Sequence, residues 1–167
     1  MLISNYKIFV PTIIVFIADQ LTKYLISVNM NPVQRDSINI ISHYLKFTYV
    51  NSSNPQEVED AIQKNTQLIW IETPTNPLLK VTDLDAVGKI AKKHGIIYGV
   101  DSTFSTPALL RPLEFGADIV QHSTTKYLSG HNQIIGGVLI TNDEKLSEQF
   151  KFIQKSVGAV PSPFDCW

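Results

Sequence analysis

After residue 50, apolar and polar positions follow two patterns, short apolar runs and helical spacing. Short apolar runs, which are typical of buried strands, occupy residues 68–71, 96–100, 117–120 and 136–140. Segments with helical spacing alternate with them, at residues 56–64, 83–94 and 143–155. This alternation predicts an α/β fold with a mostly parallel sheet and helices on its faces.

The segment 83–94 has the clearest helical boundaries. Asp83 stands at its start, Lys92 and Lys93 lie in its last turn, and Gly95 follows it. An acid at the beginning, bases at the end and a glycine just beyond are the signals of a complete helix.

Residues 8–18 show a third pattern, an apolar run interrupted by Pro11 and Thr12. Its 11 residues are fewer than the roughly 20 that a membrane-spanning helix needs. No small-residue cleavage site of a signal peptide follows it. Two interpretations remain open: a buried core helix, or a membrane helix with a functional acid, Asp19, near one end. The second would give the chain a membrane contact through residues 8–26.

The composition changes near Asn51, where residues 51–55 (NSSNP) are typical of a loop. We therefore expect two domains, residues 1–50 and 51–167. The net charge of −1, from 14 basic and 15 acidic residues, gives no sign of a nucleic-acid partner. With 44% hydrophobic and 17% charged residues the chain is expected to fold. The four histidines have no metal-ligand spacing, and the single Cys166 cannot form an internal disulfide.

Residues whose side chains could bind a cofactor or react stand at the ends of the expected strands. Asp101 follows the apolar run 96–100, and Lys126 follows the next run, with Ser123 and Thr125 beside it. Taken singly, each has an ordinary explanation as a surface lysine, a cap or a turn residue. Together they lie where ligands bind in parallel sheets, beyond the carboxyl ends of the strands. An acid that keeps a ring nitrogen protonated and a lysine that forms a Schiff base are what a pyridoxal 5'-phosphate (PLP) site needs.

Four motifs occur in order: residues 72–77 (ETPTNP), 100–107 (VDSTFSTP), 111–118 (RPLEFGAD) and 122–127 (HSTTKY). They resemble the Cys/Met-metabolism family of PLP-dependent enzymes, which includes cystathionine γ-synthases, cystathionine β- and γ-lyases and methionine γ-lyases. The resemblance runs from about residue 54 to residue 167.

The resemblance implies a fold and a set of roles. The fold is the large domain of aspartate aminotransferase-like transferases, here with an incomplete sheet. Lys126 would be the catalytic Schiff-base lysine and Asp101 the partner of the pyridine nitrogen. Ser123 and Thr125 would hold the cofactor phosphate, and Asn76 would lie near the ring's 3-hydroxyl. The substrate would be a small sulfur amino acid or a homoserine ester, and full-length members form homo-oligomers.

Two positions depart from the family pattern. Ser102 stands where the family usually has Asn, and Gln133 where it commonly has Asp. Full-length members are also more than twice as long as this chain, with a further phosphate-binding turn, a tyrosine that stacks on the ring and an arginine that clamps the substrate carboxylate. We therefore expect a truncated member that lacks part of the cofactor cradle.

The start of the chain resembles another family. Residues 16–24 (FIADQLTKY), 36–41 (DSINII) and 44–50 (YLKFTYV) look like the N-terminus of lipoprotein signal peptidases, which are membrane aspartyl peptidases. This resemblance implies an apolar N-terminal helix, but the catalytic aspartates of that family lie in later helices.

Three functions are consistent with these patterns. The first is a PLP-dependent transsulfuration enzyme that works in the cytoplasm. The second is an inactive fusion of two fragments joined near Asn51, and the third is a PLP-binding module tethered to a membrane.

Overall fold

The computed structural model describes residues 47–167, and a compact unit spans Val50–Trp167. Four strands form its sheet in the order β1-β2-β3-β4. Their bounds are Leu68–Glu72, Ile97–Asp101, Ile119–Ser123 and Gly137–Ile140. The first three strands are parallel and β4 is antiparallel to β3, so the expected α/β fold with a mostly parallel sheet is present. The expected apolar helix and membrane contact of residues 8–26 lie outside the described residues.

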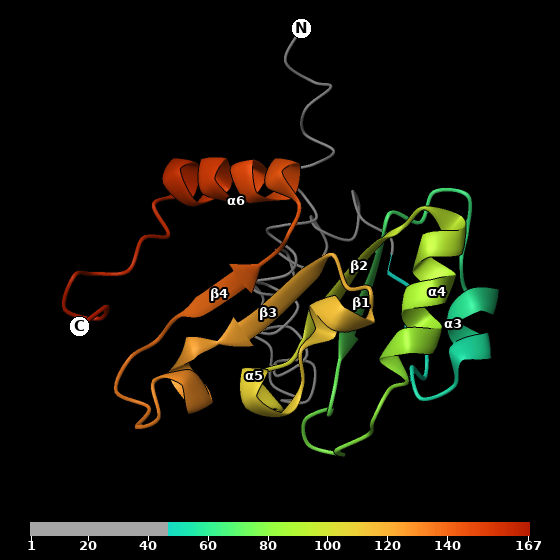
Figure 1. Ribbon diagram of the computed structural model, residues 1–167, viewed down its shortest axis with the longest axis horizontal. Coiled ribbons are helices and arrows are strands. Elements are labelled where there is room, and N and C mark those ends of the chain that lie inside the picture. The colour runs from blue at the N-terminus through green and yellow to red at the C-terminus, as the bar shows by residue number, and fades with distance from the viewer. Residues whose placement is uncertain (1–46) are drawn as a thin grey trace, which may run out of the picture. The chain divides into compact units, whose positions relative to one another are not determined.

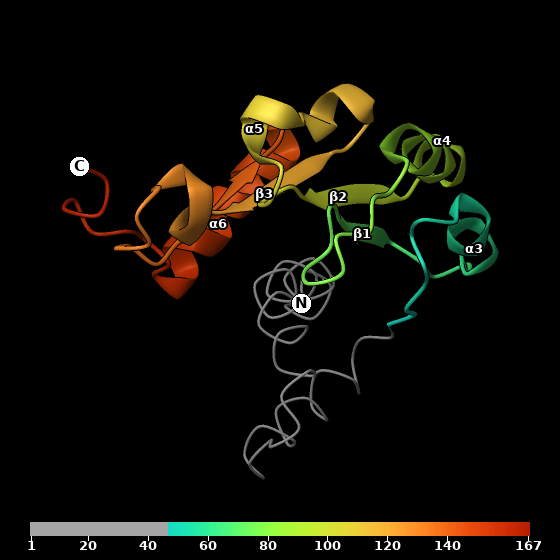
Figure 2. The same ribbon diagram turned by 90° about the horizontal axis from the view of Figure 1, so that it is seen from below.

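Helices flank and connect the strands (Figure 1). The longer ones are α4 (Leu84–His94) and α6 (Glu144–Val157), and the short ones are α3 (Pro55–Asp60), α5 (Thr106–Leu109) and the 3₁₀ turn η1 (Pro112–Phe115). Seen edge-on, α4, α5 and η1 lie on one face of the sheet (Figure 2). Within residues 47–167, no helix combines the length and the apolar character that crossing a bilayer requires.

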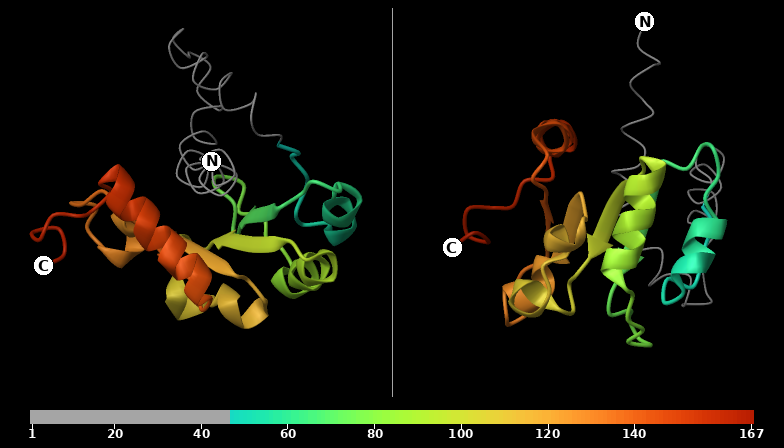
Figure 3. Two further views of the ribbon diagram at one scale, coloured as in Figure 1. Left: turned by 90° about the horizontal axis from the view of Figure 1, so that it is seen from above. Right: turned by 45° about the vertical axis from the view of Figure 1, so that its right-hand side comes forward.

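Helix α4 has the boundaries that its sequence signals predict. The side chain of Asp83 accepts a hydrogen bond from the backbone N–H of Ala86 at 3.0 Å, which satisfies one of the free donors at the helix start. Gly95 ends the helix in the left-handed conformation with φ 64°. A neighbouring short helix, α3, runs alongside α4 (Figure 3), and Lys93 of α4 reaches Glu59 of α3 at 2.6 Å.

Two elements begin or end at residues other than those that the sequence pattern predicts, and local hydrogen bonds explain both differences. Helix α3 ends earlier than expected, because the backbone N–H of Gln63 is taken by the hydroxyl of Thr66 in a turn, at 2.9 Å. Strand β2 begins one residue late, because the N–H of Ile96 bonds to the carbonyl of Ala91 at the end of α4, at 3.0 Å. In both places a local hydrogen bond replaces the continuation of the regular element.

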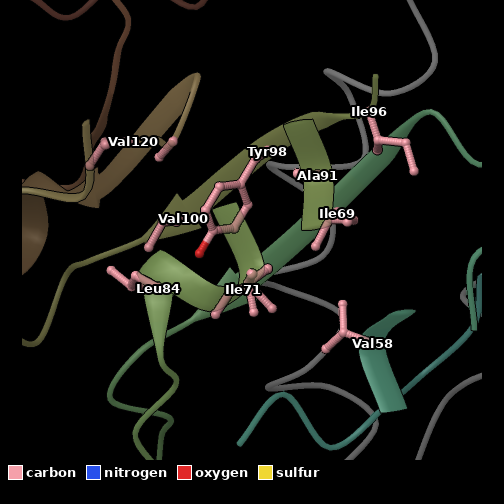
Figure 4. Close-up of a cluster of buried hydrophobic side chains, with 11 residues drawn as sticks. Val58, Ile69, Ile71, Leu84, Ala91, Ile96, Tyr98, Val100 and Val120 are labelled. Carbon is pink, nitrogen blue, oxygen red and sulfur yellow. The ribbon is translucent and has the colours of Figure 1, made fainter. Parts of the chain in front are cut away.

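The hydrophobic core lies between α4 and the sheet. Val87 of α4 and Tyr98 and Val100 of β2 are fully buried there. Figure 4 shows Tyr98 and Val100 beside Leu84 and Ile71 in this cluster. Alternate residues of β1 and β2 therefore face the helix, and the residues between them, Asp101 among them, face the other side of the sheet.

Candidate functional site

The carboxyl ends of the three parallel strands bring the sequence-predicted acid and hydroxyl residues to one edge of the sheet. Asp101 ends β2 and Ser123 ends β3, which confirms that they stand at strand ends. Glu72 ends β1 in the same way. Because Glu72 pairs with Asp101 and Asp101 with Gln121 in register, these three side chains lie on the same face of the sheet.

Asp101 is buried, with 6% of its surface exposed. Its Oδ1 accepts two hydrogen bonds from Thr103, from the backbone N–H at 2.9 Å and from the hydroxyl at 2.6 Å. The side chain of an aspartate bonded to the backbone two residues later forms a tight local turn. Donors of this kind favour the ionised carboxylate.

The neighbouring strand adds a further donor to the same carboxylate. The amide nitrogen of Gln121 faces Asp101 and donates to Oδ2 at 2.6 Å and to Oδ1 at 3.2 Å. The amide oxygen of Gln121 faces the other way and accepts from the backbone N–H of Ser123 at 3.2 Å. The surrounding donors and acceptors set this orientation of the amide.

Thr103 also joins Asp101 to the strand that leads to the lysine. While its hydroxyl donates to Asp101, its Oγ1 accepts the backbone N–H of Ser123 at 2.9 Å. The hydroxyl is thus a bridge between the end of β2 and the end of β3. We refer to Asp101, Thr103, Gln121 and Ser123 together as the acid cluster.

Lys126 lies in a turn, Thr124–Leu128, directly after β3. The turn is of the wide π type and is interrupted at Lys126, where ψ is −120°. The side chain of Lys126 is exposed. Short turns of this type often occur at functional sites. Phe104 and Tyr127 pack edge to face with ring centroids 6.5 Å apart, so the loop after β2 contacts the turn that carries Lys126.

Thr125 anchors this turn to the start of β4. Its Oγ1 accepts the backbone N–H of Gly136 at 3.0 Å, and the N–H of Thr124 donates to the carbonyl of Gly136 at 3.0 Å. Both bonds tie the turn to the residue that precedes the antiparallel strand. Asn76 is exposed in the loop that follows β1. The structure therefore gathers Asp101 and Ser123 through shared hydrogen bonds and holds Thr125 and Lys126 on the adjoining turn.

A buried histidine lies on the opposite face from Gln121. His122 is 2% exposed, and burial lowers its pKa, while the charge of Asp101 and a hydrogen bond to the backbone of Ser102 act in the opposite direction. Within the described residues, His122 Nδ1 and Ser102 Oγ have no hydrogen-bond partner. Ser102, one of the two departures from the family pattern, is itself fully buried.

Sequence reasoning missed Thr103 and Gln121. The spacing Asp-x-Thr is an available signal for Thr103, because an aspartate often bonds to the backbone two residues on. Gln121 has no such signal, since its contact depends on the register between β2 and β3, which the sequence pattern does not fix.

These groups fit a ligand with a protonatable ring nitrogen, an aldehyde and a phosphate. The carboxylate of Asp101, which is buried and accepts hydrogen bonds from Thr103 and Gln121, suits a positively charged nitrogen. The amine of Lys126 suits an aldehyde, and the turn after β3 carries hydroxyls for an anion. This donor set is that of a PLP site.

Comparison with known proteins leads to the same chemistry. The family model described as "Cys/Met metabolism PLP-dependent enzyme" matches residues 35–167, so the match begins before residue 51, where the second domain was expected to start. The cystathionine γ-synthase of Mycobacterium leprae is 52% identical over 121 residues, which are 72% of this chain and 31% of that protein. The cystathionine γ-lyase of Bacillus subtilis is 51% identical over 123 residues, 74% of this chain and 32% of that protein.

Solved structures share the fold. The metB protein of Corynebacterium glutamicum has a TM-score of 0.69 at 47% identity, over 71% of this chain and 31% of that chain. The cystathionine γ-lyase of Lactobacillus plantarum, solved with L-serine, has a TM-score of 0.72 at 39% identity, over 75% of this chain and 33% of that chain. The chain thus spans about a third of the length of such relatives. With its family match over most of its length, the chain belongs to the Cys/Met-metabolism family of PLP-dependent enzymes.

Proposed function

We propose that this chain carries the lysine-and-acid part of a PLP-dependent transsulfuration enzyme of the cystathionine γ-synthase or cystathionine lyase type. The single observation that carries the proposal is the acid cluster at the edge of the sheet, joined through Ser123 to the turn that holds Lys126. The similarity to cystathionine γ-synthases and γ-lyases supports the reaction type.

Each residue of the site has a proposed role. When bound, PLP supplies an aldehyde that takes up an amine and a ring that withdraws electrons from the substrate's α-carbon. Lys126 provides the amine that holds the cofactor and then moves a proton at the α-carbon as general acid and base. Asp101 holds the ring nitrogen in its protonated form. Ser123 and Thr125 bind the phosphate, and Asn76 orients the ring through its 3-hydroxyl.

The acid cluster suits the role of Asp101. The carboxylate is buried and accepts hydrogen bonds from Thr103 and Gln121, and donors of this kind favour a charged carboxylate. A fixed negative charge in a site sheltered from water interacts strongly with a positive ring nitrogen. The same bonds hold the carboxylate in one orientation, so that little reorganisation accompanies binding.

Labelling of Lys126 is the test of this proposal. The 167-residue chain is expected to bind PLP with an absorption band near the edge of the visible range, and borohydride should fix the cofactor to the peptide that contains Lys126. Lys126→Ala should abolish the label, whereas Lys155→Ala, at an exposed lysine of α6, should leave it unchanged. A label that survives Lys126→Ala would refute the assignment.

Turnover distinguishes an active enzyme from the inactive fusion. We expect little or no release of an α-keto acid from cystathionine by this chain alone, because positioning of the substrate supplies a large share of catalysis and the chain spans about a third of its relatives. Clear release that Lys126→Ala abolishes would contradict this expectation. Labelling of Lys126 without any release would favour the inactive product.

We also propose that residues 1–50 are a separate segment that resembles a signal peptidase start, with a membrane contact through residues 8–26. The residues from 51 on would then work in the cytoplasm and form a homo-oligomer as the full-length family does. Fractionation of cells that express the chain with and without residues 1–50 tests this. Equal recovery of both forms from the membrane pellet would contradict it.

A further inference from the structure

Two side chains from different elements, Thr103 and Gln121, donate hydrogen bonds to the carboxylate of Asp101. Thr103, in the loop after β2, donates twice to Oδ1. Gln121, on the next strand, donates to Oδ2 at 2.6 Å. We propose that Gln121 is a positioning residue that holds Asp101 ionised and oriented for the ring nitrogen of the cofactor. The proposal rests on the function proposed above and adds a residue that neither the sequence motifs nor the family resemblance assigns.

The register of the sheet explains why Gln121 can do this. Asp101 and Gln121 are partners across the parallel pair β2 and β3, so their side chains leave the same face side by side. A glutamine is long enough for its amide to turn back onto the neighbouring carboxylate. With its nitrogen on Asp101 and its oxygen on the N–H of Ser123 at 3.2 Å, the amide is fixed at both ends.

The charges around Asp101 make this donor important. Glu72 is its partner on β1, so a second acid stands beside Asp101 on the same face. A like charge disfavours ionisation, and burial of Asp101 acts in the same direction. His122 on β3 interacts with Asp101 from the other side of the sheet. The amide of Gln121 offsets the two unfavourable effects without adding a charge of its own.

A pH series of cofactor binding tests the role. We expect the acid limb of the binding profile to move to higher pH by about half a unit to one unit in Gln121→Met, the size of shift that loss of one hydrogen bond produces. Gln121→Glu, which replaces the donor with a like charge, should move it further. Gln154→Met, at an exposed glutamine of α6, should match the wild type. An equal loss of binding at every pH, with an unmoved acid limb, would mean that Gln121 only supports the fold.

The apoprotein supplies a second measurement that needs no cofactor. The urea midpoint of Gln121→Met should lie below that of the wild type at neutral pH, and the gap should close as the pH is lowered, because a protonated Asp101 loses the benefit of the amide donor in both proteins. In proteins that also carry Asp101→Asn, the difference in urea midpoint between Gln121 and Gln121→Met should no longer depend on pH. A pH-dependent difference that persists in those proteins would overturn the role of Gln121. Failure of the wild type to bind PLP would refute the proposed function instead, while the apoprotein series still decides the role of Gln121.

Discussion

His122 is the buried ionisable side chain next to the acid cluster, and its protonation links the site to pH. Burial lowers its pKa from the ordinary value of 6.5, so the unfolded chain binds a proton more readily than the folded chain. The stability that comes from the neutral imidazole is therefore present above about pH 6.5 and is lost as the pH falls below it.

We predict that His122→Gln flattens the pH dependence of stability between about pH 6.5 and the lower pKa of the folded state. The contribution of one histidine is at most about 1.4 kcal/mol for each pH unit in this window. Urea unfolding at half-unit pH steps measures it. His131→Gln, at an exposed histidine, is the control and should keep the wild-type slope. An unchanged slope in His122→Gln would contradict the assignment.

At this scale the sequence predicts some residues of the site and misses others for a physical reason. Asp101 directly follows an apolar run, so its place at a strand end can be predicted from the pattern alone, and the structure confirms it. Ser123 also ends a strand, but that strand runs three residues beyond the apolar run that predicts it. Gln121 lies inside a strand that the pattern ended at residue 120. Its contact with Asp101 depends on strand register, which is set by packing of the whole sheet.

Among the elements, α4 and β3 show where prediction succeeds and fails. Helix α4 carries its own start and stop signals in Asp83 and Gly95, and the structure confirms both. Strand β3 was expected at residues 117–120 but spans Ile119–Ser123. The N–H of Ala117 bonds to the carbonyl of Pro112 in η1 instead, and the first contact with β2 is the bond from the N–H of Asp118 to the carbonyl of Tyr98. The strand then continues through polar residues because their partners on β2 and β4 hold them.

The contact between α4 and η1 leads to a prediction about Gly88. A Cβ built on Gly88 would collide with the carbonyl oxygen of Phe115. Gly88→Ala gains about 1 kcal/mol of helix propensity, but forcing an extra carbon into a packed contact costs about 1–3 kcal/mol. We expect a net loss of up to about 2 kcal/mol in the free energy of unfolding.

Chemical denaturation of the variant measures this loss. Lys92→Ala, at an exposed position of the same helix, is the matched control and should change the free energy of unfolding by about 0.5 kcal/mol or less. A Gly88→Ala protein more stable than the wild type would show that η1 moves away from α4 freely.

For the whole molecule, the described part of the chain leaves many large apolar side chains in contact with water. Four are more than 80% exposed: Leu109, Ile135, Phe164 and Trp167. Parallel sheets are normally covered on both faces, and exposed apolar patches beyond a few hundred Å² favour association. The 167-residue chain is thus expected to associate with itself or with membranes.

Size-exclusion chromatography with thermal unfolding tests this expectation. The full chain should elute as aggregated or membrane-associated material. Deletion of residues 1–50 should improve solubility and give the form used for the denaturation series, with a transition broader than that of a fully cooperative domain. A monodisperse full chain with a sharp transition in detergent-free buffer would contradict the prediction. It would mean that the first 50 residues form one working architecture with the rest.

The strand order β1-β2-β3-β4 has a consequence for synthesis of the chain. Each strand pairs with the strand that immediately precedes it in the sequence, so a growing chain on the ribosome can add strands one at a time, with its N-terminal part first. Glu72, Asp101 and Ser123 would arrive at the edge in that order. Until β3 has been made, Asp101 would have only Thr103 of the acid cluster beside it. Gln121 would follow as part of β3, and Lys126 would emerge directly after it. The proposed cofactor residues Asp101 and Lys126 would thus come together only after Gln121 has paired with Asp101.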